Sequence, residues 1–145
     1  FYDLAPHQIN ILEDMFGCIL DAKGFKNNIG KLYQAEDSIS ACFCFDSGLI
    51  GSGSWCFVAH ESAKEDRIEI VGDKGMVCFS VFSFEPIALH NEKGRQEIVI
   101  PNPPHVQQPL IQAVVDHLLG KSICTSDGYN ATTVNWVMDK ILGKL

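Results

Sequence analysis

Asp3 and His7 are the residues whose types and spacing best suit proton transfer, and they stand four positions apart at the start of an expected helix. Histidine changes charge near neutral pH, which makes it the usual side chain for taking a proton from a hydroxyl group. Residues four apart on a helix share a face, so Asp3 could orient the His7 imidazole or bind a hydroxyl beside it. The alternative is that Asp3 only caps the helix and that His7 is a solvated first-turn residue.

The helix that must position His7 is expected over Pro6–Phe16. A proline is acceptable in a first turn, where its missing N–H leaves no hydrogen bond unmade, and Gly17 is a plausible stop. Cys18–Asp21 is then expected as a short strand, and the segment Lys23–Lys31, rich in Gly and Asn, as an exposed loop. The helix prediction depends on apolar residues at helical spacing, which are Ile9, Leu12, Met15 and Phe16.

The centre of the sequence has the pattern of an antiparallel hairpin. Apolar residues alternate with small ones before the turn Asp46–Gly48, and Leu49–Val58 forms the expected return strand. On that strand, Gly51 and Gly53 would leave one face low enough for another backbone, a ligand or a subunit to approach. The alternating apolar residues of the first strand are Ile39, Ala41, Phe43 and Phe45.

The remaining pattern predicts more strands followed by two helices. The helices are expected over Val106–Leu119 and Gly128–Leu142, with Ser126 or Asp127 as the N-cap of the second. Strands grouped together, without alternating helices, indicate an α+β fold with an open, mostly antiparallel sheet and helices packed on one face. We expect one domain over residues 1–145. The further strands are expected at Arg67–Val71, Met76–Val81, Ile87–His90 and Glu97–Ile100.

Composition excludes several classes of protein. The chain is 46% hydrophobic and carries a net charge of -7, which argues against a nucleic-acid or membrane-surface binder. No apolar run approaches the roughly 20 residues that a membrane span needs, and there is no signal-peptide pattern, so we expect the cytoplasm.

The six cysteines do not suggest a disulfide framework. We expect small buried thiols, because four of them lie in apolar, strand-like segments and two stand alone. No metal site is expected, since the paired Cys-x-x-Cys or closely spaced His ligands of a zinc site are absent. The cysteines are Cys42, Cys44, Cys56 and Cys78 in the strands, with Cys18 and Cys124 alone.

Three segments together resemble one family. Residues 3–10, Asp-Leu-Ala-Pro-His-Gln-Ile-Asn, are similar to the Asp-x-Gly-x-His-x-x-Asp motif of the Gfo/Idh/MocA oxidoreductases, the family of glucose-fructose oxidoreductase and inositol dehydrogenase. Residues 68–75 are similar to the family's strand, Gly-x-x-Gly turn and strand, and residues 125–131 to the segment before its last helix. The chain resembles the C-terminal domain of this family from end to end.

The resemblance implies a two-domain enzyme of which this chain is the substrate-binding and catalytic half. An N-terminal Rossmann domain would hold NAD or NADP and supply a lysine from a Glu-Lys-Pro motif. This chain has neither that motif nor Gly-x-Gly-x-x-Gly, so we expect no dinucleotide bound to it and no hydride transfer by it alone. Because the chain begins at Phe1, we expect it to be an excised half.

The resemblance also assigns roles to individual residues. His7 would transfer the proton, Asp3 would assist it, and the substrate would be a sugar, a polyol or a related hydroxylated small molecule. Two positions depart from the motif: Ala5 replaces a Gly, and Asn10 replaces an Asp, so a candidate substrate contact carries an amide in place of a charge. Trp55, on the glycine-rich strand, either packs in the core or an interface or stacks on a sugar ring.

Self-association is the remaining expectation. The family pairs subunits through their sheets, so we expect a homodimer through the uncovered sheet face. The alternative function is a non-catalytic oligomerisation or ligand-binding module of the same fold.

Overall fold

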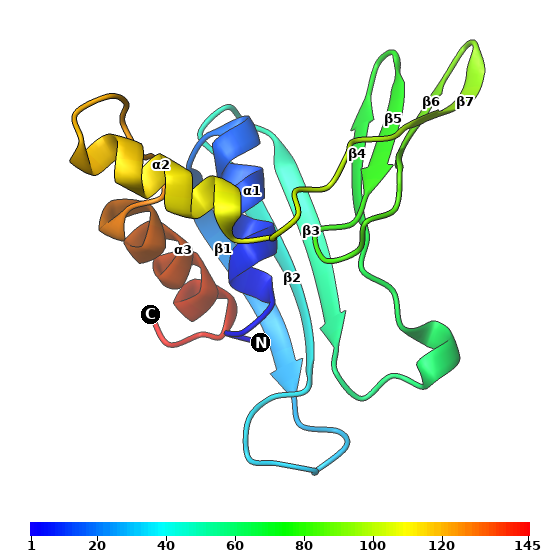
Figure 1. Cartoon of the computed structure of the whole chain (residues 1–145). Coiled ribbons are helices and arrows are strands. Elements are labelled where there is room, and N and C mark those ends of the chain that lie inside the picture. Colours follow the sequence, from blue (N-terminus) through cyan, green and yellow to red (C-terminus); the bar gives the residue numbers. More distant parts are fainter. The chain divides into compact units, whose positions relative to one another are not determined.

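The structure is a computed structural model that describes all residues from 1 to 145, and the chain divides into two compact units (Figure 1). The first unit comprises Phe1–Lys64 and Ser126–Leu145, and the second comprises Glu65–Thr125. The expected α+β class is confirmed, with antiparallel strands that form two sheets. The α-helices and strands in chain order are α1 (Ala5–Phe16), β1 (Ile19–Asn27), β2 (Ser38–Phe45), β3 (Ile50–Cys56), β4 (Ile68–Gly72), β5 (Gly75–Phe79), β6 (Ile87–Asn91), β7 (Gly94–Ile98), α2 (Gln108–Leu118) and α3 (Gly128–Ile141).

The first unit is a three-stranded sheet covered on one face by two helices. Its strand order is β1-β2-β3, and both neighbouring pairs are antiparallel. Figure 1 shows α1 and α3 on the same side of this sheet. The apolar residues of β2 that alternate in sequence point toward the helices, and burial of each large side chain stabilises the fold by roughly 1.5–3 kcal/mol. The core cluster includes Ile9, Ile39, Phe43, Phe45, Val137, Met138 and Ile141.

Strand β1 is longer than the sequence pattern predicted. The loop expected from Lys23 is wrong as far as Asn27, because β1 pairs with β2 up to the partners Asn27 and Ser38. Gly24 accounts for part of the difference: a Cβ there would lie 2.8 Å from the backbone oxygen of Ile141, so this glycine permits close packing of α3 on the strand. The polar residues of β1 lie on an edge strand, where water can solvate them.

The glycines of β3 face the helices, which corrects the expectation that they leave a face open to a partner. A Cβ on Gly51 would lie 2.1 Å from the ring of Phe43, and a Cβ on Gly53 would lie 2.6 Å from the ring of Trp55. The rings of Phe43 and Trp55 therefore fill the space over the two glycines on the helix-covered face of the sheet.

The opposite face of this sheet, which we call the outer face, carries exposed side chains from all three strands. Cys42 and Cys44 alternate with the core residues of β2 and are exposed on this face, so the prediction of buried thiols is wrong for them. Cys18 and Cys56 are also exposed, and all six cysteines are free. The exposed residues of the outer face include Asp21, Lys23, Phe25, Ser40, Cys42, Cys44, Ile50, Ser52, Ser54 and Cys56.

The second unit is a four-stranded antiparallel meander with the order β4-β5-β6-β7. The turn expected between Gly72 and Gly75 is confirmed. Strand β7 begins at Gly94, three residues before the predicted Glu97, because a tight turn joins it to β6 through the pair Asn91 and Gly94. Helix α2 belongs to this unit and has no buried residue.

Helix α3 begins at Gly128 as its sequence predicts and ends at Ile141, one residue before the predicted Leu142. The carboxylate of Asp127 accepts hydrogen bonds from the backbone N–H groups of Tyr129 and Asn130, which confirms one of the two expected N-caps. Val134, Val137, Met138 and Ile141 form its buried face. None of the helices of the chain combines the length and the apolar character that crossing a membrane requires.

Candidate functional site

Helix α1 fixes the direction of the His7 side chain. Ala5 and Ile9 are 0% and 1% exposed and anchor the start of the helix in the core. Because buried residues recur at helical spacing, His7 lies between the two anchors on the outward side and is exposed. Asn10, one turn further on, is half-buried. The helix predicted from Pro6 to Phe16 is thus confirmed, with one additional residue at its start.

Asp3 lies in the turn that precedes α1. The N-cap position belongs to Leu4, which makes no side-chain capping bond, so the alternative in which Asp3 caps the helix is wrong. The backbone is already coiled there: the N–H of Ala5 donates to the carbonyl of Phe1 at 3.1 Å, and the N–H of His7 donates to that of Leu4 at 3.3 Å. Asp3 is exposed and lies one turn ahead of His7.

Trp55 is packed on the helix-covered face of the sheet and contacts both α1 and the turn before it. Its indole N–H donates to the side-chain oxygen of Gln8 at 2.6 Å. The Phe1 ring meets the Trp55 ring edge-on, with 5.1 Å between centroids. Of the two alternatives for Trp55, the structure shows packing against the core, and stacking on a sugar stays a prediction.

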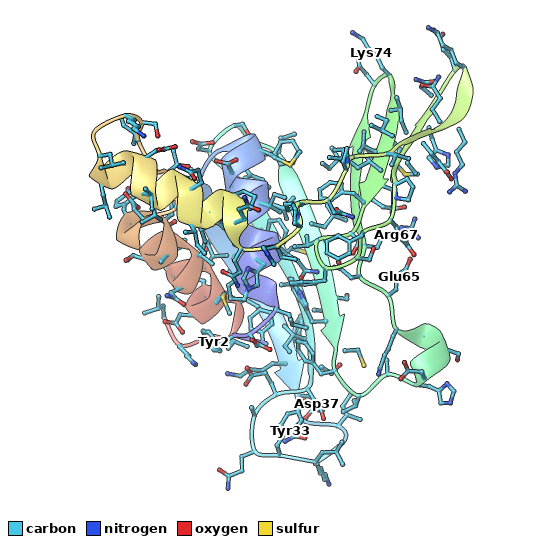
Figure 2. All side chains as sticks on the ribbon, in the orientation of Figure 1. Tyr2, Tyr33, Asp37, Glu65, Arg67 and Lys74 are labelled. Atoms are coloured by element: carbon cyan, nitrogen blue, oxygen red, sulfur yellow. The ribbon has the colours of Figure 1, made fainter.

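Tyr2 joins the turn before α1 to the end of α3. Its hydroxyl donates to the carboxylate of Asp139 and accepts from the ammonium group of Lys144 at 2.8 Å. The Lys144 ammonium also lies 4.4 Å from the centre of the Tyr2 ring. Burial and the hydrogen bond to Asp139 raise the pKa of Tyr2 above its usual value. Figure 2 shows Tyr2 beside the C-terminal end of α3.

The four residues that the sequence singled out all lie in the first unit. Asp3, His7 and Asn10 follow one another along the turn and the first half of α1, and Trp55 reaches the same helix through Gln8. The contacts of Phe1, Tyr2 and Gln8 were not predicted. Their partners are 47 or more positions away along the chain, and no local pattern indicates such pairs.

The chain contains no recognisable site for a metal or for the phosphates of a dinucleotide. No group of three or more His, Cys, Asp or Glu side chains is arranged to hold a metal ion. The one strand followed directly by an α-helix is β7, and residues 99–107 between them contain no glycine, whereas a dinucleotide pyrophosphate needs a glycine-rich turn at a helix start.

Comparisons with known proteins relate this chain to one family of oxidoreductases. The family model described as the GFO/IDH/MocA C-terminal domain matches residues 1–78. Oxidoreductase P35 of Formosa agariphila is 29% identical over 143 residues, which make up 99% of this chain and 43% of that protein.

Solved structures share the fold at low sequence identity. An oxidoreductase from Agrobacterium radiobacter, in complex with NAD+, L-tartaric acid and magnesium, superposes with a TM-score of 0.78 at 13% identity, over 97% of this chain and 45% of that one. The WlbA dehydrogenase from Bordetella pertussis, in complex with NADH and UDP-GlcNAcA, gives 0.73 at 19% identity, over 97% and 41%. The chain spans less than half the length of these proteins.

Proposed function

Because this chain belongs to the GFO/IDH/MocA C-terminal domain family, we propose that it is the substrate-binding and proton-transferring half of an NAD(P)-dependent oxidoreductase. The nucleotide would be held by a separate Rossmann domain, in keeping with relatives that are more than twice as long as this chain. The proposed substrate is a sugar, a polyol or a related hydroxylated small molecule.

The exposure of His7 on an anchored helix is the observation that carries this proposal. Ala5 and Ile9 are buried on either side of it, so the imidazole cannot swing into the core and has a fixed origin. A general base must lie within hydrogen-bond reach of the proton it takes, and an exposed imidazole on a rigid element meets that requirement.

In alcohol oxidation, each candidate residue of this chain would have its own role. His7 takes the proton of the substrate hydroxyl, and Asp3, one turn ahead, orients the imidazole or binds a neighbouring hydroxyl. When bound by its own domain, the nicotinamide cofactor supplies the hydride acceptor. Asn10 presents an amide that both donates and accepts hydrogen bonds, which suits a hydroxyl-bearing substrate. The exposed part of the Trp55 ring would pack on an apolar face of a sugar.

The ligands of structural relatives support the substrate class. UDP-GlcNAcA and L-tartaric acid, found with the two relatives described above, both carry hydroxyl groups on carbon. They also differ greatly in size, so proteins of this fold bind ligands of more than one shape. The cytoplasm is the compartment we propose, because its reducing conditions suit six free thiols.

Self-association through the outer face is a second proposal with its own observation. Phe25 and Ile50 are 87% and 77% exposed on that face, and an open groove over it is lined by Lys23, Ser40, Cys42 and Ser54 among others. Monomers seldom leave such an apolar surface uncovered. A homodimer through this face is compatible with catalysis. In the alternative proposal, a non-catalytic oligomerisation or ligand-binding module, forming the dimer or binding a ligand would be the chain's function.

A substitution in the full protein that contains this domain tests the catalytic proposal. We expect His7→Ala to lower kcat by roughly 10²-fold or more on the best substrate of a panel of sugars and polyols, read by absorbance of the reduced nicotinamide. His60→Ala is the matched control, because the His60 ring is exposed and hydrogen-bonds to Ser62 within its own loop. Unchanged turnover in His7→Ala would exclude His7 as the base.

A further inference from the structure

We propose that Tyr2, Asp139 and Lys144 form a clamp, by which the C-terminal end of α3 positions the turn that carries Asp3 ahead of His7. This inference rests on the proposed function, because it concerns the geometry of the same site. It makes Tyr2 a positioning residue that acts through the backbone of the turn.

The three groups of the clamp, a phenol, a carboxylate and an ammonium, attract one another. Tyr2 donates to the Asp139 carboxylate, Lys144 donates to the Tyr2 hydroxyl at 2.8 Å, and the Lys144 ammonium lies 3.6 Å from an Asp139 oxygen. The phenol thus serves as donor to the anion and acceptor from the cation at once. Hydrogen bonds to ionised groups are about twice as strong as neutral ones, and although solvent weakens these exposed contacts, together they favour one position of the ring.

The α3 side of the clamp is rooted in the core. Asp139 follows Met138, which is 0% exposed, and precedes the equally buried Ile141 by two positions. Lys144 is directed by the turn that ends the helix: its N–H donates to the carbonyl of Asp139 at 2.9 Å, and Gly143 adopts the left-handed conformation with φ of 63°. Both charged groups therefore start from fixed backbone positions.

The turn is held from its other side as well. The Phe1 ring packs against Trp55, and Trp55 donates to Gln8 on α1. Asp3 lies between these attachments, in a turn whose residues Tyr2, Asp3 and Leu4 are all exposed. The backbone bond from Ala5 to the Phe1 carbonyl lies outside the regular helix, so its hydrogen exchange reports a loosening of the turn.

The test uses Tyr2→Phe, which removes one hydroxyl and leaves the aromatic ring. In the 145-residue chain we expect the NMR signal of the His7 ring to shift and hydrogen exchange of the Ala5 amide to accelerate roughly tenfold, as expected from losing hydrogen bonds to charged groups. The amides of Met138 and Ile141 should keep their protection. Tyr33→Phe is the control, since Tyr33 accepts a hydrogen bond from Asn28 through its backbone carbonyl, which the substitution keeps.

Unchanged His7 signals and unchanged Ala5 exchange in Tyr2→Phe would overturn the inference. Asp139→Asn gives a second reading, because it keeps the side-chain shape while removing the charge, and we expect the same direction of change. In the full protein, Tyr2→Phe should lower kcat severalfold with KM within about twofold, as a misplaced catalytic group does. If His7→Ala abolishes turnover while Tyr2→Phe leaves kcat intact, the clamp is wrong and the proposed function stands. If the NMR changes occur but His7→Ala is fully active, the proposed function is wrong.

Discussion

The indole N–H of Trp55 donates to the side-chain oxygen of Gln8 at 2.6 Å, which joins strand β3 to helix α1 at the residue directly after His7. Two residues 47 positions apart are thereby coupled beside the candidate base. This bond ties the strand to the helix at one position beyond His7.

Trp55→Phe tests that coupling. We expect a loss of about 1–3 kcal/mol in the free energy of unfolding, because the Gln8 oxygen loses its donor in a partly buried position. Urea denaturation measures the loss. Trp136→Phe is the control for reduced ring area, since Trp136 also packs partly buried against the core. Equal effects of the two substitutions would show that the hydrogen bond contributes nothing beyond packing.

Asp37 anchors the loop that connects β1 and β2. Its side chain is 0% exposed and accepts hydrogen bonds from the N–H groups of Ile29 at 2.8 Å and Gly30 at 2.7 Å (Figure 2). Asp37→Ala leaves both donors without this acceptor, so we expect a loss of roughly 2–4 kcal/mol. Glu36→Gln, next to it, should change the unfolding free energy by less than about 0.5 kcal/mol. A loss in Asp37→Ala as small as that of the control would contradict the anchoring role.

Gly51→Ala tests the packing of the Phe43 ring against the backbone of β3. The new Cβ would lie 2.1 Å from the Phe43 ring, so the core must shift, at a cost of roughly 1–3 kcal/mol. Gly128→Ala is the matched control because no atom lies within 4 Å of the Cβ position there. Thermal unfolding should separate the two variants clearly. Similar melting temperatures would mean that the ring of Phe43 moves aside freely.

Thiol labelling tests the dimer proposed through the outer face. Cys42 and Cys44 are exposed in the single chain, so a dimer through this face should protect them increasingly as protein concentration rises. Cys18, which precedes β1, serves as the internal reference. Mass spectrometry after a brief pulse of alkylating reagent reads each site. Constant labelling at every concentration, with light scattering that shows only monomer, would exclude the dimer.

The raised pKa of Tyr2 predicts a loss of stability in alkaline solution. The folded state holds the phenolic proton to higher pH than the unfolded state, whose value is near 10.0. The contribution is therefore complete below pH 10 and is lost as pH rises through the folded value. Lys144, whose pKa is raised by its hydrogen bond to Tyr2, acts in the same direction. Tyr2→Phe should flatten this decline in urea titrations above pH 10, whereas Tyr33→Phe should keep it, and an identical decline in both would contradict the assignment.

The sequence predicted the elements well where periodicity was local. The alternation from Ile39 to Phe45 gave β2, and the spacing around Ile9 gave α1. It failed for the second half of β1, because Lys, Gly and Asn are typical of loops and only pairing with β2 makes this segment a strand. It also assigned the thiols of Cys42 and Cys44 to the interior, because apolar neighbours on a strand do not reveal which face the helices cover.

The candidate site was predicted only in part for a related reason. The types and spacing of Asp3, His7 and Asn10 are visible in ten residues of sequence. The residues that hold them, Tyr2 with Asp139 and Phe1 with Trp55, meet only after the chain has folded. Contacts between residues so far apart in the chain cannot be predicted from local composition or periodicity.

Chemical rescue of His7→Ala is the sharpest test of proton transfer by His7. In the full protein containing this domain, we expect His7→Ala to lose most of its turnover and added imidazole to restore a measurable part, because the free base takes the place of the missing side chain. Asp3→Ala should be slower than the unaltered enzyme and insensitive to imidazole. A His7→Ala enzyme as fast as the unaltered one would contradict the assignment of proton transfer to His7.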